Sequence, residues 1–283
     1  MSERNSITRL FIISTFILII HACSSANFDN RDEKLTEDEI LHYAQDPDRF
    51  IAHAGGQVMG YNYTDSLEAL DLSFSKGFQK FELDIIKTSD GYYVAAHDWK
   101  KWKKITGFTG DIPPTKQQFL NEKIYGRFTP LDMDKINDWF QSHPNSILVT
   151  DKVRDIDAFS NLFIDKNRLI MEIFEWKDIK NAQQAGIMSA MPSGNLLLDF
   201  EGDVIKYLLE SNISEVAVSR NFINTNLELL IGLKKAGIRA YAFHVNKKKG
   251  KGTDYMICNE SRFFYGMYSN FWQSGMKPKC VDI

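Results

Sequence analysis

The chain has 283 residues, of which 43% are hydrophobic and 13% aromatic, and its formal net charge is −3. This is enough apolar material for one large buried core, and the length fits a single α/β barrel. The slightly acidic balance provides no overall positive field, so the composition argues against a nucleic-acid-binding protein.

Residues 1–23 have the pattern of an export signal. Arg4 and Arg9 precede an apolar run at residues 10–20, and Cys23 follows a small residue. The run is too short to span a bilayer comfortably, but it fits the apolar region of a signal peptide. The cysteine resembles a bacterial lipoprotein cleavage site. We therefore expect an exported protein, anchored to a bacterial membrane through a lipidated Cys23 and facing the periplasm or the cell surface. An uncleaved signal anchor is the alternative.

A polar segment and a short helix precede the main body. Residues 24–36 are polar and charged, as in a tether. Thr36, with Glu39 three residues later, has the form of a capping box before a short helical pattern. No Gly/Ser/Pro-rich linker or internal repeat divides the rest of the chain. We expect a tether and short helix over residues 24–45, and a single domain over residues 46–283.

Short apolar runs alternate with helical patterns along this domain. Such alternation predicts a parallel sheet with crossover helices, and so many units favour closure into a (β/α)8 barrel. The second and third strands are joined by the turn Ser89-Asp-Gly91, which is too short for a crossover helix, so the barrel should be irregular there. Helices are expected at residues 66–76, 132–141 and 227–235. Strands are expected at residues 50–54, 80–86, 92–97, 147–152, 169–174, 186–191, 216–219, 238–245 and 264–268.

Two carboxylates lie within the second expected strand. Glu82 and Asp84 are two residues apart, so their side chains should point the same way and converge. Two carboxylates on one face of an apolar strand are costly unless they bind something positive. A hard divalent cation such as Ca²⁺ or Mg²⁺ takes oxygen ligands and fits this arrangement. Ion pairs with Lys80 or Lys87 are the alternative.

Two histidines lie at or near the ends of expected strands. His53 is followed by two glycines, which allow an unusual turn and a close ligand approach, and His97 ends the third strand. Two imidazoles beside a cation can act as general base and general acid, although the sequence does not say which histidine takes which role. Asp98 is expected to cap the loop after this strand or to hold His97 in one tautomer. This combination suggests metal-assisted phosphodiester chemistry.

In residue type, order and spacing, these segments resemble the glycerophosphodiester phosphodiesterases and the related phosphatidylinositol phospholipases C. The resemblance covers residues 50–272 and implies an irregular TIM barrel of the phospholipase-C-like phosphodiesterase type. The segments that carry it most specifically are His53-Ala-Gly-Gly, Thr64-Asp-Ser-Leu, Gly77-Phe-Gln-Lys-Phe-Glu-Leu-Asp84, Ser89-Asp-Gly91 and Val94-Ala-Ala-His-Asp98.

The resemblance also implies further site residues. Val149-Thr-Asp-Lys152 stands where the family has Glu-x-Lys, so Asp151 is expected as a third metal ligand and Lys152 as a phosphate contact. Adjacent residues on a strand point to opposite faces, so both reach one site only if the strand breaks into a loop there. Glu172, inside a later apolar run, is a second possible carboxylate. Ala54 replaces the arginine that contacts phosphate in the family.

The activity implied is cleavage of a phosphodiester whose alcohol carries a neighbouring hydroxyl. The substrate would be a glycerophosphodiester, a phospholipid headgroup or a phosphorylated glycan. His53 and His97 would transfer the protons beside a cation held by Glu82 and Asp84. One alternative is a phosphotransferase (lyase) reaction that releases a cyclic phosphate. Another is an inactive lipoprotein that binds a phosphorylated glycan or a lipid headgroup.

Basic residues cluster at residues 100–104 and 247–251. These runs are either solvated loops or a basic rim that steers an anionic substrate toward the barrel, since both come after strands with candidate site residues.

Two cysteines remain besides Cys23. In an exported protein, Cys258 and Cys280 lie in an oxidising compartment, where they either form a disulfide that ties the C-terminal tail to the last loop or stay apart.

Overall fold

The structure is a computed structural model that describes residues 34–247 and 249–280. All described residues fall within one contact unit, Glu33–Ile283. The expected signal peptide and the lipidated Cys23 lie outside the described residues and stay predictions. In the part of the chain that the structure describes, no helix combines the length and apolar character needed to cross a membrane.

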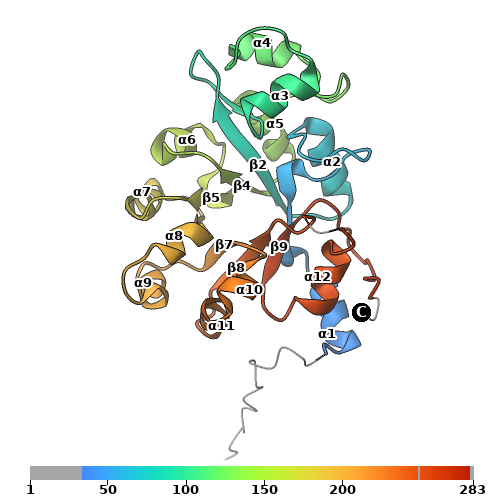
Figure 1. Cartoon of the computed structure of the whole chain (residues 1–283). Helices are drawn as coiled ribbons and strands as arrows, with labels where there is room; N and C mark the ends of the chain where they lie inside the picture. Colours follow the sequence, from blue (N-terminus) through green and yellow to red (C-terminus); the bar gives the residue numbers. More distant parts are fainter. Residues whose placement is uncertain (1–33, 248, 281–283) are drawn as a thin grey trace, which may run out of the picture. The chain divides into compact units, whose positions relative to one another are not determined.

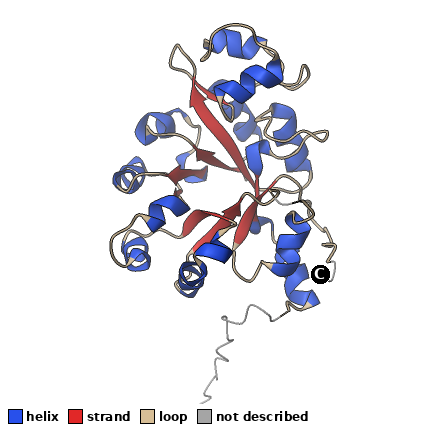
Figure 2. Ribbon diagram, viewed as in Figure 1, coloured by secondary structure: helices blue, strands red, loops and turns tan. Residues whose placement is uncertain are grey.

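Eight parallel strands form a barrel in the described part of the chain (Figures 1 and 2). They are β1 (Phe50–Ala52), β2 (Lys80–Lys87), β4 (Ile147–Asp151), β5 (Leu169–Ile173), β6 (Ser189–Pro192), β7 (Glu215–Ser219), β8 (Arg239–Phe243) and β9 (Gly266–Ser269). The hydrogen-bonded order is β6-β5-β4-β2-β1-β9-β8-β7. A parallel bridge from Ser193, next to β6, to Ala217 in β7 joins the two ends. The expected (β/α)8 architecture is confirmed.

The barrel is irregular where the sequence predicted it. β3 (Tyr93–Ala95) pairs antiparallel with the end of β2 instead of entering the barrel. Every expected strand is present, although some bounds differ. The strand expected at residues 186–191 begins only at Ser189, because Gly186 adopts a left-handed conformation and ends the preceding helix. β8 stops at Phe243, because His244 has a left-handed φ of +64°.

Helices surround the barrel (Figure 2). They are α1 (Glu37–Gln45), α2 (Leu67–Ser75), α3 (Trp99–Thr106), α4 (Lys116–Asn121), α5 (Met133–Ser142), α6 (Ile156–Leu162), α7 (Lys177–Ala185), α8 (Gly194–Leu198), α9 (Val204–Glu210), α10 (Phe222–Thr225), α11 (Leu227–Lys235) and α12 (Thr253–Asn259). The helices expected at residues 66–76, 132–141 and 227–235 correspond to α2, α5 and α11. The predicted capping box also forms: Thr36 Oγ1 accepts from the Glu39 amide, and the Glu39 carboxylate accepts from the Thr36 amide.

The basic run at residues 100–104 lies in a helix, so its interpretation as a loop is wrong. Asp98 caps α3 by accepting a hydrogen bond from the Lys101 amide at 2.7 Å. Trp102 is buried and stacks on Phe119 of α4, which anchors the helix. A local cap and tertiary packing together outweigh the mutual repulsion of the lysines.

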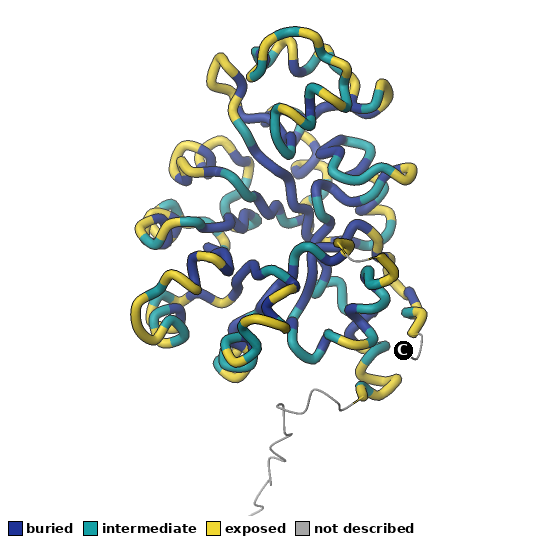
Figure 3. Tube along the Cα trace, viewed as in Figure 1, coloured by how far each residue is buried: buried dark blue, intermediate teal, exposed yellow. Residues whose placement is uncertain are grey.

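Most residues along the strands are buried (Figure 3), and their apolar side chains fall into two clusters. Phe81 and Leu83 of β2 belong to the large core between strands and helices. A second cluster fills the inside of the barrel: Ile51, Val149, Ile170, Met191, Ala217, Tyr241 and Tyr268. Because side chains alternate along a strand, Lys80, Glu82 and Asp84 point into the barrel, and their charges must be satisfied there.

The two cysteines of the described residues form a disulfide. Cys258 of α12 is bonded to Cys280, with their Cα atoms 5.6 Å apart. The C-terminal tail is therefore tied to α12, which was one of the two options that the sequence left open.

Candidate active site

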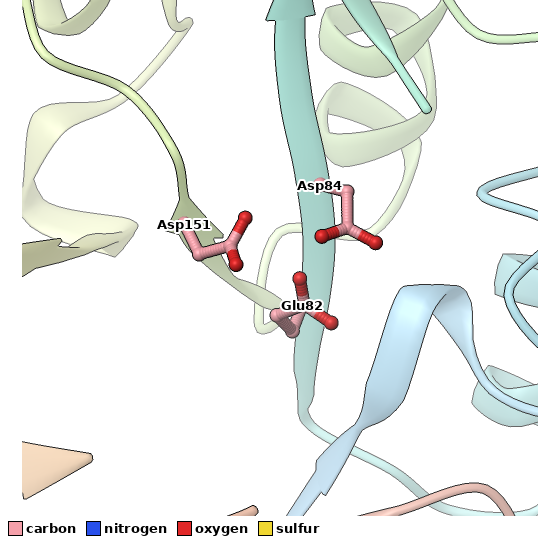
Figure 4. Close-up of side chains that lie close together, drawn as sticks. All are labelled: Glu82, Asp84 and Asp151. Carbon is pink, nitrogen blue, oxygen red and sulfur yellow. The ribbon is translucent and has the colours of Figure 1, made fainter. Parts of the chain in front are cut away.

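Three carboxylates from neighbouring strands converge at the carboxyl end of the barrel (Figure 4). Glu82 and Asp84 lie on β2, and Asp151 is the last residue of β4. The parallel register places Asp84 and Asp151 opposite each other. One oxygen from each of the three side chains lies within 4.8 Å of the others. We call this set the carboxylate cluster; it brings together the three residues expected as metal ligands.

The carboxylate cluster is short of hydrogen-bond donors. Glu82 Oε2 accepts from the Ala54 amide at 2.7 Å. Among the described residues, however, Asp84 Oδ2 has no hydrogen-bond partner, and Asp151 Oδ1 has only a longer ion-pair contact of 3.4 Å with Lys152 Nζ. Buried carboxylate oxygens without donors are costly. Because oxygen atoms are the ligands that Ca²⁺ and Mg²⁺ prefer, the donor set fits a hard divalent cation.

Shifted pKa values report the same crowding of negative charge. Burial, followed by the charge of Asp84, raises the pKa of Glu82 well above its usual range. Burial, with Asp84 and Glu172, raises the pKa of Asp151 to about 9. Burial also raises the pKa of Glu172 to about 7, although this side chain accepts a hydrogen bond from the Tyr268 hydroxyl. A bound cation would favour the ionised form of each carboxyl group.

Lys152 reaches the same point because β4 breaks. The strand ends at Asp151, and Lys152 has a left-handed φ of +62°. Its Nζ contacts Asp84 Oδ1 and lies 3.4 Å from Asp151 Oδ1. On a regular strand, the adjacent side chains of Asp151 and Lys152 would point to opposite faces. Because the strand breaks at Lys152, as expected, both side chains reach the same site.

The two lysines that the sequence offered as partners for the carboxylates point elsewhere. Lys80 Nζ binds Asp48 at the opposite end of the barrel, and Lys87 Nζ lies 4.6 Å from the centroid of the Tyr93 ring. The alternative interpretation, in which Glu82 or Asp84 forms an ion pair with Lys80 or Lys87, is therefore wrong.

A tight turn after β1 positions the first histidine. His53 opens a short 3-10 helix, and Ala54 within it has a φ of +50°. Gly56 has a φ of +95°, and a Cβ at this position would lie 2.1 Å from Ser73 Oγ. The glycine is therefore needed both for the turn and for its close packing on α2, which explains one of the two glycines in the motif.

Both histidines pack against the ring of Tyr63. The Tyr63 ring centroid is 4.7 Å from that of His53 and 5.5 Å from that of His97. Burial lowers the pKa of His53 to about 4, against the opposing charge of Asp84, so this imidazole is neutral at neutral pH. His97 Nδ1 lies 2.7 Å from Asp98 Oδ2, which orients its ring. Asp98 contacts His97 as expected, but the segment that it caps is helix α3 and not a loop.

Sequence reasoning missed two neighbours of the site, Tyr63 and Asp65. Asp65 is buried; its Oδ1 accepts from the Asp84 amide at 3.1 Å, and its Oδ2 has no hydrogen-bond partner among the described residues. Tyr63 and Asp65 have φ values of +57° and +45°, which non-glycine residues rarely adopt. The only signal was the segment Thr64-Asp-Ser-Leu, which does not reveal that the loop folds back over β2.

Comparison with known proteins supports the fold. No protein-family model and no curated protein matches the sequence. A phosphodiesterase from Oleispira antarctica, solved in complex with the product sn-glycerol-3-phosphate, has a TM-score of 0.62 at 16% identity, covering 78% of this chain and 92% of that chain. A glycerophosphoryl diester phosphodiesterase from Parabacteroides distasonis has a TM-score of 0.60 at 15% identity, covering 84% and 89%. The chain thus shares the barrel fold that the resemblance implied.

Proposed function

We propose that the protein is a metal-dependent phosphodiesterase of the glycerophosphodiester type, which cleaves a phosphodiester with a neighbouring hydroxyl. One observation carries the proposal: His53 and His97 contact the same Tyr63 ring beside the carboxylate cluster at the carboxyl end of the barrel. The charge of Asp84 acts on His53, and the Asp84 carbonyl accepts from the amide of Ala96, the residue before His97. Active sites of (β/α)8 enzymes lie at this end. The shared fold with a phosphodiesterase that binds sn-glycerol-3-phosphate supports the choice of substrate class.

The residues divide the chemistry between them. A Ca²⁺ or Mg²⁺ ion on the carboxylate cluster would neutralise phosphoryl oxygens and lower the pKa of the attacking hydroxyl. His53, neutral because it is buried, accepts the proton of that hydroxyl. His97, whose side chain is 39% exposed and oriented by Asp98, protonates the departing alkoxide. The resulting cyclic phosphate is opened by water, with the two histidines exchanging roles.

Lys152 contributes positive charge at the same point. Its ammonium is held by Asp84 and Asp151 in the structure. When a cation binds these carboxylates, the ammonium is available to contact a phosphoryl oxygen, as the resemblance implies.

The location of the protein is part of the proposal. The export signal at residues 1–23 and the lipid anchor on Cys23 rest on the sequence alone. The disulfide between Cys258 and Cys280 agrees with them, because such bonds persist in oxidising compartments. The substrate would then be a phospholipid headgroup, a phosphorylated glycan or a free glycerophosphodiester outside the cytoplasm.

Turnover of glycerophosphodiesters and of a chromogenic diester, with Ca²⁺ or Mg²⁺, tests the proposal. We expect ³¹P NMR to show a phosphomonoester as the final product. Accumulation of a cyclic phosphate would instead indicate the lyase reaction, and no turnover of any diester with either cation would favour the binding protein.

Glu82→Gln is the matched variant for this test. It removes one charge while keeping an oxygen that can accept from the Ala54 amide. We expect it to weaken cation binding and to lower turnover at least about tenfold, in line with the loss of a metal-site interaction. Unchanged cation dependence would contradict the assignment of Glu82 as a ligand.

A further inference from the structure

A second lysine lies at the candidate active site. Lys101 belongs to the first turn of α3, and its Nζ lies 3.6 Å from the centroid of the Tyr63 ring. The same ring packs against both His53 and His97. Lys101 also lines a small cavity together with Tyr63, Asp65 and His97. Its ammonium is therefore placed beside the proposed catalytic pair.

The position of Lys101 relative to His97 is fixed by one carboxylate. Asp98 Oδ1 accepts from the Lys101 amide at 2.7 Å, and Asp98 Oδ2 lies 2.7 Å from His97 Nδ1. Trp102, the next residue in α3, is buried and holds the helix in place. The lysine is therefore presented to the site by a rigid element, whereas lysines on exposed loops are free to reorient.

Lys101 differs from Lys152 in what holds its ammonium. Lys152 is engaged by two carboxylates of the cluster. Within the described residues, Lys101 has no ion pair with a carboxylate, and its charge rests on the face of the Tyr63 ring. Burial lowers the pKa of Lys101, while the charges of Asp65 and Asp84 oppose that shift. A cation that is oriented but not paired is suited to an anionic ligand.

The turn after β1 cannot supply such a charge. Ala54 is buried, has only a methyl side chain and uses its amide to bind Glu82. We propose that Lys101 contacts the phosphate group of the substrate and provides the positive charge that Ala54 does not. The inference deepens the proposed function and rests on it, because it assigns a phosphate ligand to the same site.

Calorimetric titration of the full protein with inorganic phosphate, in the presence of Mg²⁺, tests this inference. We expect Lys101→Ala to weaken phosphate binding about 10- to 100-fold, as for loss of one charged hydrogen bond. Lys101→Arg should retain most of the affinity, because it keeps the charge. The value of kcat/KM for a phosphodiester should fall in parallel with phosphate affinity.

Lys100→Ala is the matched comparison, since Lys100 is exposed on the same helix and carries the same charge. It should weaken phosphate binding by less than about threefold, as expected for a screened surface charge. Equal losses of phosphate affinity in Lys100→Ala and Lys101→Ala would show that the positive charge of α3 as a whole attracts phosphate. That result would overturn the inference. Unchanged affinity in Lys101→Ala, or no phosphate binding by the native protein, would overturn it too.

The two proposals can fail separately. If the native protein binds phosphate through Lys101 but cleaves no diester, the proposed function is wrong, and Lys101 remains a phosphate ligand of a binding site. If it cleaves diesters while Lys101→Ala retains both phosphate affinity and kcat/KM, the inference is wrong and the proposed function stands.

Discussion

Buried charges are paired at the amino end of the barrel, whereas carboxylates crowd together at its carboxyl end. At the amino end, Lys80 Nζ donates to the carbonyl of Asp48 at 2.8 Å and lies 3.1 Å from the Tyr241 hydroxyl, and it also pairs with the Asp48 carboxylate. Arg239 pairs with Glu215 at 2.9 Å in the same region. At the carboxyl end, the carboxylate cluster gathers three acids, of which Asp84 and Asp151 pair with Lys152, and at least one of their oxygens, Asp84 Oδ2, has no hydrogen-bond partner among the described residues.

This difference separates a structural site from a functional one. Lys80 at the amino end and Glu82 at the carboxyl end are only two residues apart on the same strand. The local sequence therefore does not reveal which of these buried charges is paired. Paired charges with satisfied hydrogen bonds hold strands together. An excess of one charge lowers stability, and it is expected where a ligand of the opposite charge binds. Variants at the two ends should therefore respond in opposite ways.

The largest effect is expected at the carboxyl end. His53→Ala and His97→Ala should each lower kcat about 10²–10⁴-fold, because each removes a group that we propose transfers a proton. The melting temperature of His97→Ala should change little, since this imidazole is half exposed. Steady-state kinetics and thermal unfolding measure both quantities. Full turnover by either variant would refute its catalytic role.

His143→Ala is the control for these variants. His143 lies after α5, away from the site, and stacks on Trp139 with ring centroids 4.0 Å apart. Its loss should lower stability and leave kcat unchanged.

At the amino end, stability should fall instead of activity. Lys80→Met leaves Asp48 without its main partner, so we expect the free energy of unfolding to drop by about 2 kcal/mol, less than for a fully buried pair because the Asp48 side chain is 38% exposed. Chemical denaturation measures this loss. The kcat of the folded variant should stay within about twofold of the native value. A kcat that falls well beyond twofold while the free energy of unfolding is unchanged would contradict the structural role of the amino end.

A pair of acid-to-amide variants sharpens the comparison. Without divalent cation, Asp151→Asn should raise the free energy of unfolding by about 1 kcal/mol. The pKa of Asp151 is raised to about 9, so at neutral pH the folded protein must hold this acid protonated, and the amide avoids that cost. Glu215→Gln should lower it by about the same amount, because Glu215 is buried against Arg239. Added Ca²⁺ or Mg²⁺ should stabilise the native protein and Glu215→Gln more than Asp151→Asn. Melting temperatures with and without cation measure these differences. A larger stabilisation of Asp151→Asn than of the native protein by cation would contradict the metal site.

The smallest effect concerns pH at the amino end. Burial raises the pKa of Asp48, but hydrogen bonds from Lys80 and Tyr265 and the nearby positive charges outweigh it, so the pKa is lowered overall. A lowered pKa stabilises the fold above the unfolded value of about 3.9, and this contribution is lost as the pH falls through the folded pKa. Asp48→Asn should therefore be less stable than the native protein at pH 7, and the gap in melting temperature should narrow below about pH 4. A gap that stays constant would contradict this account.

Much of the fold could be predicted because its signals are local. Short apolar runs marked all the strands, and the capping box at Thr36 marked the start of the first helix. The convergence of Glu82 and Asp84 was predictable from the two-residue period of a strand. Helix α3 was missed, because its stability depends on the burial of Trp102, which a run of lysines conceals.

The sequence by itself determined which side chains share a face of a strand and which residues stand at strand ends. Only the tertiary structure decided that the loop carrying Tyr63 and Asp65 folds over β2, and that α3 delivers Lys101 to the same point. It also decided that Lys80 pairs with Asp48, across the barrel's amino end, and not with the acids on its own strand. The physical reason is that periodicity and capping depend on a few adjacent residues, whereas these contacts join segments whose approach depends on how the whole barrel closes.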